Sequence, residues 1–378
     1  MSQNTYVPGL EGVVAAQTRM SKVDGLAGEL VIGGFKLETI ADKASYEEMV
    51  YQLWYGQLPT EIDLQTFTAE LAALRSLPAA ALDLLRSIAH KDLDMMDALR
   101  VATGVLGTET DAQDSDEWLA KRLLAATPTI VAAAWRLRNG QEPLSPDPKL
   151  AHAANYLYML EGQAPSAARA RGLETYLNTV IDHGLNASTF TARVIASTGS
   201  DFVSAIVGAI GALKGPLHGG APGPALDMVF EIGEVSRAEE VLRKKLDAGE
   251  RLMGFGHRVY KVRDPRADVL AKAAREFYEA DGDMQLYHLV EEVEKIAIRV
   301  LEEHKPGRNL QTNVEFYTAL LLHGLGFSVP CFTPTFAVGR VGGWLAHCFE
   351  QRENARIIRP QSEFIGDDNR AWVEVSQR

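Results

Sequence analysis

Apolar residues recur with helical spacing along most of this chain, and short polar or Pro- and Gly-rich breaks separate the repeats. The one early exception is segment 30–37, where apolar residues flank a Gly33-Gly34 turn and predict a small β-hairpin. The fold class we expect is therefore mainly α. The pattern predicts helices over 44–56, 61–76, 79–90, 94–106, 115–125, 128–138, 150–161, 166–182 and 187–199.

Two later segments have the pattern of buried helices with glycine faces. Segment 201–214 is nearly uncharged and ends at a Gly-Pro pair, which stops a helix. Thr333 is the expected N-cap, with Pro334 at the first helical position, of a helix that runs to about Glu350. The glycines allow another helix to approach closely, either in a deep core or at a subunit interface.

Composition limits the class of protein. The 378 residues are 46% hydrophobic, and 38 Lys+Arg against 50 Asp+Glu give a net charge of −12, which argues against general nucleic-acid binding. Neither a signal peptide nor a membrane-spanning apolar run is evident. Cys331 and Cys348 lack metal-ligand spacing and are expected to be buried thiols in a reducing compartment. We expect a cytoplasmic globular protein.

The strongest chemical signal is segment 254–266, Gly-Phe-Gly-His-Arg-Val-Tyr-Lys-Val-Arg-Asp-Pro-Arg. Five bases and one acid between Arg251 and Arg266, in an acidic chain, indicate a pocket for a polyanion. His257 lies beside this charge on a glycine-rich turn, which indicates chemistry at the same place. The turn lacks the third glycine and the preceding strand of a dinucleotide-binding loop.

Three further motifs carry weaker signals. His218 lies in the Gly- and Pro-rich segment 215–224, which is either a ligand-binding loop or a plain turn. His183 either binds a ligand or interacts only with a helix dipole, and Glu315 is either a buried base or a surface acid at a helix start. The histidines and acids form no metal-ligand signature, so no metal is expected.

Together and in order, these motifs resemble the citrate synthase family. They are Gly-Leu-Glu-Gly-Val at 9–13, Val-Asp-Gly at 23–25, Asp-His-Gly-Leu-Asn at 182–186, Gly-Pro-Leu-His-Gly-Gly at 215–220, the 254–266 segment and Asn-Val-Glu-Phe-Tyr at 313–317. The likeness extends from about residue 8 to 366 and fits the short form without an N-terminal regulatory domain. It implies two helical domains, a large one of 1–218 plus 319–378 and a small one of 219–318.

The resemblance implies an acyltransferase of the tricarboxylic acid cycle. It would condense acetyl-CoA with oxaloacetate and hydrolyse citryl-CoA to citrate and CoA, without a cofactor or metal. The implied catalytic residues are His218, His257 and Glu315. The implied oxaloacetate ligands are His183, His257, Arg266, Arg340 and Arg359, the last from the partner subunit of a homodimer, and the implied CoA ligands are Lys261, Arg258 and Arg263.

Two residues depart from the family pattern. Glu315 stands where the family has aspartate, and its additional methylene lengthens the reach by roughly 1 Å. Pro222 stands where an asparagine is expected, so a backbone donor and a side-chain amide are both missing. Two alternatives remain open. A 2-methylcitrate synthase, which uses propionyl-CoA, has the same motifs, and a non-catalytic relative would bind CoA or organic acids.

Overall fold

The computed structural model describes residues 6–89, 92, 94–109, 115–219, 222–354 and 356–378. The chain is mainly helical with one small sheet near the N-terminus, so the predicted fold class is confirmed. The α-helices of the described ranges are α1 (Leu37–Ile40), α2 (Tyr46–Tyr55), α3 (Glu61–Ala73), α4 (Ala79–Ala89), α5 (Met95–Leu106), α6 (Asp116–Arg138), α7 (His152–Glu161), α8 (Ala167–Val180), α9 (Ala187–Ser197), α10 (Phe202–Leu213), α11 (Pro222–Ile232), α12 (Val235–Asp247), α13 (Pro265–Asp281), α14 (Met284–His304), α15 (Val314–Gly324) and α16 (Phe332–Asn354).

The sheet is antiparallel, with the strand order β1 (Ser21–Asp24), β2 (Glu29–Ile32) and β3 (Phe35–Lys36). The predicted hairpin is β2–β3, in which Ile32 pairs with Phe35 across the Gly-Gly turn. The sequence prediction missed β1, which pairs Ser21 with Ile32. Its four residues, Ser-Lys-Val-Asp, contain one apolar side chain, so they lack the alternation by which a strand is recognised.

Two predicted helix boundaries were wrong. Helix α6 is continuous through Pro128, although two helices were expected there; the residues around Pro128 are buried, and packing on all sides outweighs the missing hydrogen bond. Helix α16 begins at Phe332, directly after the 3₁₀ turn Val329–Cys331. Thr333 therefore lies inside the helix, and its hydroxyl donates to the Gly219 carbonyl at 2.8 Å, whereas an N-cap hydroxyl would accept a backbone N–H of the first turn.

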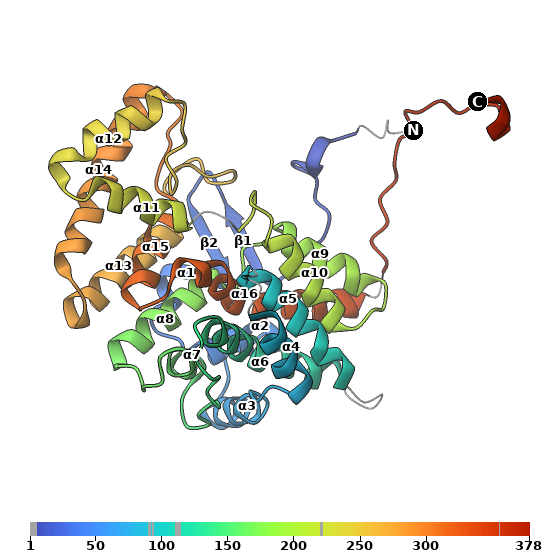
Figure 1. Ribbon diagram of the computed structural model, residues 1–378, viewed down its shortest axis with the longest axis horizontal. Coiled ribbons are helices and arrows are strands. Elements are labelled where there is room, and N and C mark those ends of the chain that lie inside the picture. The colour runs from blue at the N-terminus through green and yellow to red at the C-terminus, as the bar shows by residue number, and fades with distance from the viewer. Residues whose placement is uncertain (1–5, 90–91, 93, 110–114, 220–221, 355) are drawn as a thin grey trace.

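Helix α16 runs through the centre of the helical body (Figure 1). A Cβ on Gly343 would lie 2.1 Å from the carbonyl oxygen of Ile181, and one on Gly339 would lie 2.6 Å from Val180. The glycine face of α16 thus contacts the end of α8 in the core, which is one of the two placements expected for it. This contact also brings Arg340 of α16 against the turn that follows α8.

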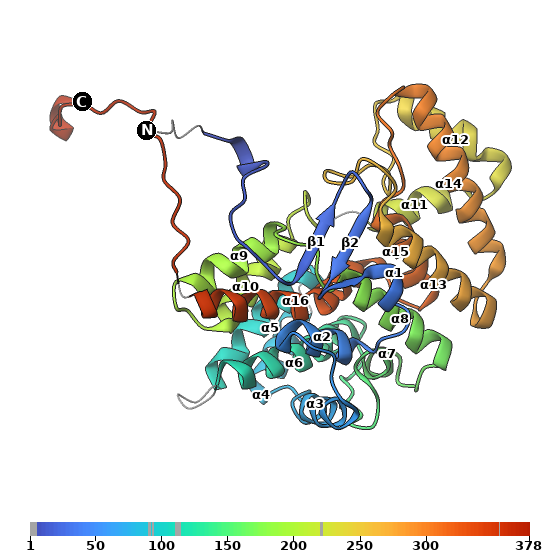
Figure 2. The same ribbon diagram turned by 180° about the vertical axis from the view of Figure 1, so that it is seen from behind.

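Helices α11, α12, α13 and α14 gather on one side of the molecule, and β1 and β2 lie next to this group (Figures 1 and 2). The N- and C-terminal segments both leave the helical body, and residues 356–374 form an extended, mostly exposed arm. Across the described ranges, every helix is too short or too polar to cross a membrane.

Candidate active site

The turn between α8 and α9 carries His183. Asp182 is completely buried and accepts a hydrogen bond from the Ser21 hydroxyl of β1 and one from the Gly184 N–H at 3.2 Å. Burial lowers the pKa of His183 well below its ordinary value, and the nearby charges of Arg266 and Arg340 lower it further. The His183 ring is therefore neutral at physiological pH.

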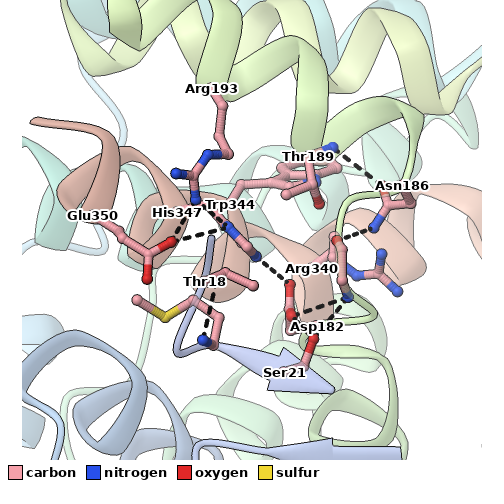
Figure 3. A network of polar contacts seen from close by, with 12 residues as sticks. Thr18, Ser21, Asp182, Asn186, Thr189, Arg193, Arg340, Trp344, His347 and Glu350 are labelled. Carbon is pink, nitrogen blue, oxygen red and sulfur yellow. Dashed lines mark hydrogen bonds and ion pairs between the residues drawn. The ribbon is translucent and has the colours of Figure 1, made fainter. Parts of the chain in front are cut away.

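A buried polar network around Asp182 holds the turn between α8 and α9 in place (Figure 3). The Arg193 guanidinium lies 3.0 Å from Nδ1 of His347, so Nδ1 accepts and Nε2–H donates to Asp182 at 3.1 Å. Burial alone would raise the pKa of Asp182, but His347 and Arg340 keep it below its ordinary value. Asp182 thus remains a carboxylate and fixes the backbone that carries His183.

His218 lies in the turn that follows α10, and its Nε2 is 2.9 Å from the Ser188 hydroxyl. That hydroxyl also lies 2.8 Å from Oδ1 of Asn186 and accepts from Nε1 of Trp344 at 3.1 Å. Burial lowers the pKa of His218 to about 4, with Arg340 contributing, so this imidazole is also neutral.

His257 follows two glycines with positive φ, and a Cβ on Gly254 would lie 2.9 Å from Phe316 of α15. Its Nδ1 accepts the backbone N–H groups of Val259 at 3.1 Å and Tyr260 at 3.0 Å. Burial, with Arg266 contributing, lowers its pKa to about 4. In the neutral ring the proton is therefore on Nε2, which faces the Nη2 of Arg266 at 3.3 Å. The two N–H groups can therefore both donate to one oxygen atom of a ligand.

Arg266 and Glu315 are joined by Asp264, which is fully buried. Asp264 accepts from Nη2 of Arg266 at 2.8 Å and from its Nε at 3.0 Å, and it also accepts the Val314 N–H of the first turn of α15 at 3.3 Å. Glu315 is the next residue of that turn. Burial raises its pKa to about 7, and Asp264 contributes, although Arg266 acts in the opposite direction.

Arg340 is a buried cation with 1% exposure. Its Nε donates to the Val180 carbonyl, and its guanidinium lies 4.7 Å from the ring centroid of Phe336. Within the described part of the chain, no hydrogen bond or ion pair uses its Nη nitrogens. Burial lowers its pKa to about 10, and it acts on the pKa values of His183 and His218. The Nη groups of Arg340 are therefore free for a ligand at the site that contains His183 and His218.

The predicted site residues fall into two groups. The structure brings together His183, His218, His257, Arg266, Glu315 and Arg340. Lys261 and Arg258 are exposed neighbours on the loop of His257, whereas the guanidinium of Arg263 is paired with Asp268 and Glu294. Arg359 is exposed on the C-terminal arm, away from this group.

Sequence reasoning missed the residues that orient these groups. Ser188 had no recognisable signal, because its contact with His218 spans 30 residues. Tyr260 and Asp264 were inside a recognised motif but had no assigned role. Pro222 is the first residue of α11, where its missing N–H breaks no hydrogen bond within the helix. Across the described residues, no three His, Cys, Asp or Glu side chains are grouped to hold a metal ion.

The fold and site define a mainly helical protein in which neutral histidines and buried arginines lie together. A model of the citrate synthase C-terminal domain matches residues 9–361. The citrate synthase of Haloferax volcanii is 41% identical over 98% of both chains, and 2-methylcitrate synthase 1 of Corynebacterium glutamicum is 38% identical over 100% of both. The citrate synthase of Thermoplasma acidophilum, solved as a ternary complex with carboxymethyl coenzyme A and oxaloacetate, is 30% identical, with a TM-score of 0.89 over 98% of this chain and 99% of that chain. This chain therefore belongs to the citrate synthase family.

Replacing Asp264 with asparagine should destabilise the protein strongly, because it leaves Arg266 as a buried cation without a counter-charge. We expect Asp264→Asn to lower the free energy of unfolding by about 3–5 kcal/mol in urea denaturation. Asp268→Asn is the matched control, since Asp268 pairs with Arg263 at an exposed position and should change this energy by less than about 1 kcal/mol. Equal effects of the two variants would contradict the role given to Asp264.

Proposed function

We propose that this protein is a citrate synthase, which condenses acetyl-CoA with oxaloacetate and releases citrate and CoA. The observation that carries the proposal is the pair of buried guanidinium groups, Arg266 and Arg340, beside three neutral imidazoles and one carboxyl group of raised pKa. Two buried cations with donors free for a ligand suit a dicarboxylate, and neutral imidazoles with a poised base suit proton transfer.

The proposed oxaloacetate site consists of side-chain N–H groups that have no acceptor within the described part of the protein. Arg340 has free Nη groups, and an oxygen between Nε2 of His257 and Nη2 of Arg266 would accept from both. Arginine forks match carboxylates bidentately, so Arg266 and Arg340 hold the two carboxylates together with His183 and Arg359. With its proton on Nε2, His257 donates to the ketone oxygen and later transfers that proton as the alkoxide forms.

The proposed base is Glu315. It removes a proton from the methyl group of acetyl-CoA, a very weak acid, and each unit of pKa mismatch costs about 1.4 kcal/mol. The enolate oxygen therefore has to accept a hydrogen bond as the proton leaves. We propose that His218 supplies this hydrogen bond. The Ser188 hydroxyl has one proton and two acceptors in reach, Oδ1 of Asn186 at 2.8 Å and Nε2 of His218 at 2.9 Å; when the proton turns from Asn186 to Nε2, the neutral ring carries its own proton on Nδ1, ready for that oxygen. The enol carbon then attacks the polarised ketone, and water hydrolyses citryl-CoA.

We assign the CoA phosphates to Lys261 and Arg258. Both are exposed, and Nζ of Lys261 donates to the Arg258 carbonyl at 3.2 Å, so they lie together. Arg263 contributes less than the sequence suggested, because two carboxylates engage its guanidinium.

The chemistry uses no metal and no cofactor. A cytoplasmic location is also proposed, in which the unpaired buried thiols of Cys331 and Cys348 stay reduced.

We also propose the two-domain division into 1–218 plus 319–378 and 219–318. In this division His183 and Arg340 belong to the large domain, whereas His257, Arg266 and Glu315 belong to the small one. The oxaloacetate site then consists of groups from both domains, so that binding favours closure and excludes water before the thioester reacts.

The active form we propose is a homodimer in which Arg359 enters the partner's site. Ile358 N–H donates to the Ser197 hydroxyl at 3.0 Å, which places the start of the arm at the C-terminal end of α9. Ser188 and His218 lie at the other end of α9, roughly 15 Å away at 1.5 Å per residue. The arm also leaves the helical body (Figure 2), which supports a role for Arg359 in a neighbouring subunit.

Substrate preference is the first test of the function. Purified protein should release CoA from acetyl-CoA only when oxaloacetate is present, measured by thiol release, and kcat/KM should be higher for acetyl-CoA than for propionyl-CoA. A preference for propionyl-CoA would favour the alternative, a 2-methylcitrate synthase, which the relative from Corynebacterium glutamicum represents. Binding of either ligand without turnover would favour a non-catalytic relative.

The pH dependence of the reaction should report Glu315. Its raised pKa of about 7 means that kcat/KM falls as pH decreases through 7, because the base becomes protonated, while His218 and His257 stay neutral down to about pH 4. Above pH 7, Glu315→Gln should lower kcat by roughly 10²–10⁴-fold, and the difference from wild type should shrink as pH falls. Glu174→Gln is the control, since burial also raises the pKa of Glu174 to about 7 but it lies outside the site. A wild-type profile that is flat from pH 5 to 8 would contradict this assignment.

Mixed dimers test the role of Arg359. A dimer of one Glu315→Gln chain and one Arg359→Ala chain contains one site with both defects and one intact site if Arg359 acts across the interface. Co-expression with two affinity tags should therefore yield mixed dimers with about half of the wild-type kcat, although each parent homodimer is nearly inactive. Mixed dimers no more active than the parents would show that Arg359 acts within its own chain, and an Arg359→Ala homodimer as active as wild type would show that it has no role.

A further inference from the structure

We propose that Tyr260 is a positioning residue of the oxaloacetate site and acts through His183. The inference rests on the proposed function and adds a residue to which no role has been assigned above. Its hydroxyl lies 3.1 Å from Nε2 of His183. Its ring centroid lies 4.9 Å from that of His257 and 5.9 Å from the Arg266 guanidinium carbon. Tyr260 therefore contacts three of the groups proposed to hold oxaloacetate.

The backbone on both sides of Tyr260 is fixed. Lys261 N–H donates to the Gly25 carbonyl at 2.8 Å, and Nδ2 of Asn309 donates to the Lys261 carbonyl at 2.7 Å. A Cβ on Gly25 would lie 2.3 Å from the Val259 carbonyl oxygen, so this contact requires glycine. The side chain of Tyr260 is thus directed inward, with 3% exposure.

Strand β1 connects the Tyr260 loop to His183: the turn after β1 contacts this loop, and the start of β1 contacts the turn that carries His183. Asp24 Oδ1 accepts the N–H groups of Leu26 at 3.1 Å and Ala27 at 2.9 Å, which stabilises the turn beside Gly25. At the other end of β1, the Ser21 hydroxyl contacts Asp182 and accepts the Gly184 N–H at 2.7 Å. Strand β1 therefore fixes His183 and Tyr260 relative to each other.

The hydrogen bond between them orients the ring of His183 and does not stabilise a charge. Burial, with Arg266 and Arg340, lowers the pKa of His183 well below its ordinary value, and burial raises the pKa of Tyr260 above its ordinary value, so both groups are neutral. A neutral imidazole keeps its rotamer freedom unless a partner holds it, and freedom lost on binding weakens affinity. Tyr260 removes that freedom before oxaloacetate arrives.

Tyr260→Phe keeps the ring and removes the hydroxyl. We expect KM for oxaloacetate to rise roughly three- to tenfold, the effect of losing one neutral hydrogen bond, while KM for acetyl-CoA changes less than about twofold. Tyr278→Phe is the matched control: Tyr278 is equally buried, and its hydroxyl donates to the Leu320 carbonyl at 3.0 Å. It should leave both KM values unchanged.

A double-mutant cycle with His183→Asn distinguishes positioning through His183 from a general structural effect. In the His183→Asn background, removal of the Tyr260 hydroxyl should change KM for oxaloacetate by less than about 1.5-fold, because the group that it orients is absent. Equal effects in both backgrounds, or a Tyr260→Phe enzyme indistinguishable from Tyr278→Phe, would overturn the inference alone. A wild-type protein that does not turn over oxaloacetate with acetyl-CoA would overturn the proposed function, and this inference with it.

Discussion

Asp264 joins the side chain of Arg266 to the first turn of α15, and the geometry of the site depends on this buried carboxylate. Arg266 is almost fully buried, and a buried guanidinium is tolerated only with a charge partner and satisfied donors. One carboxylate provides both and leaves the outer edge of Arg266 free toward His257. The same contact places Glu315, one residue further along α15, next to that cation. The position of the proposed base and the position of a proposed oxaloacetate ligand are therefore set by one interaction.

A second carboxylate, Asp182, has the corresponding role for Arg340 and His183. Asp182 receives hydrogen bonds from β1, from the turn it belongs to and from His347, and its charge partly offsets that of Arg340. Burial is the main cause of the lowered pKa of Arg340, and repulsion by the nearby cation Arg266 lowers it further. Each buried cation thus has a buried carboxylate near it, Asp264 for Arg266 and Asp182 for Arg340. In the proposed function, the two carboxylates of oxaloacetate bind the donors of Arg266 and Arg340 that these partners leave free.

Helix positions were largely predictable from sequence, because apolar spacing and local N-caps such as Ser45 and Asp201 determine them over a few residues. The path of α6 through Pro128 and the strand β1 were not, because packing and pairing with distant segments decide them. The proposed site residues were found as an ordered set of motifs, whereas the contacts that orient them were not. Ser188 meets His218 and Trp344 only after α9, α10 and α16 have packed together. Such contacts have no local signal in the chain.

The contacts at the start of α15 are compatible with glutamate, rather than the shorter aspartate, at position 315. Asn313 caps α15 by accepting the Glu315 N–H at 3.0 Å, and its amide donates to the Gly256 carbonyl at 2.9 Å. The start of α15 is thus tied to the loop of His257, so a helix that lies slightly back moves both groups together. A glutamate can cover the added distance to the methyl carbon of the thioester, since its extra methylene adds roughly 1 Å. Its raised pKa also makes it a stronger base than an ordinary carboxylate, which suits a substrate as weakly acidic as a thioester methyl group.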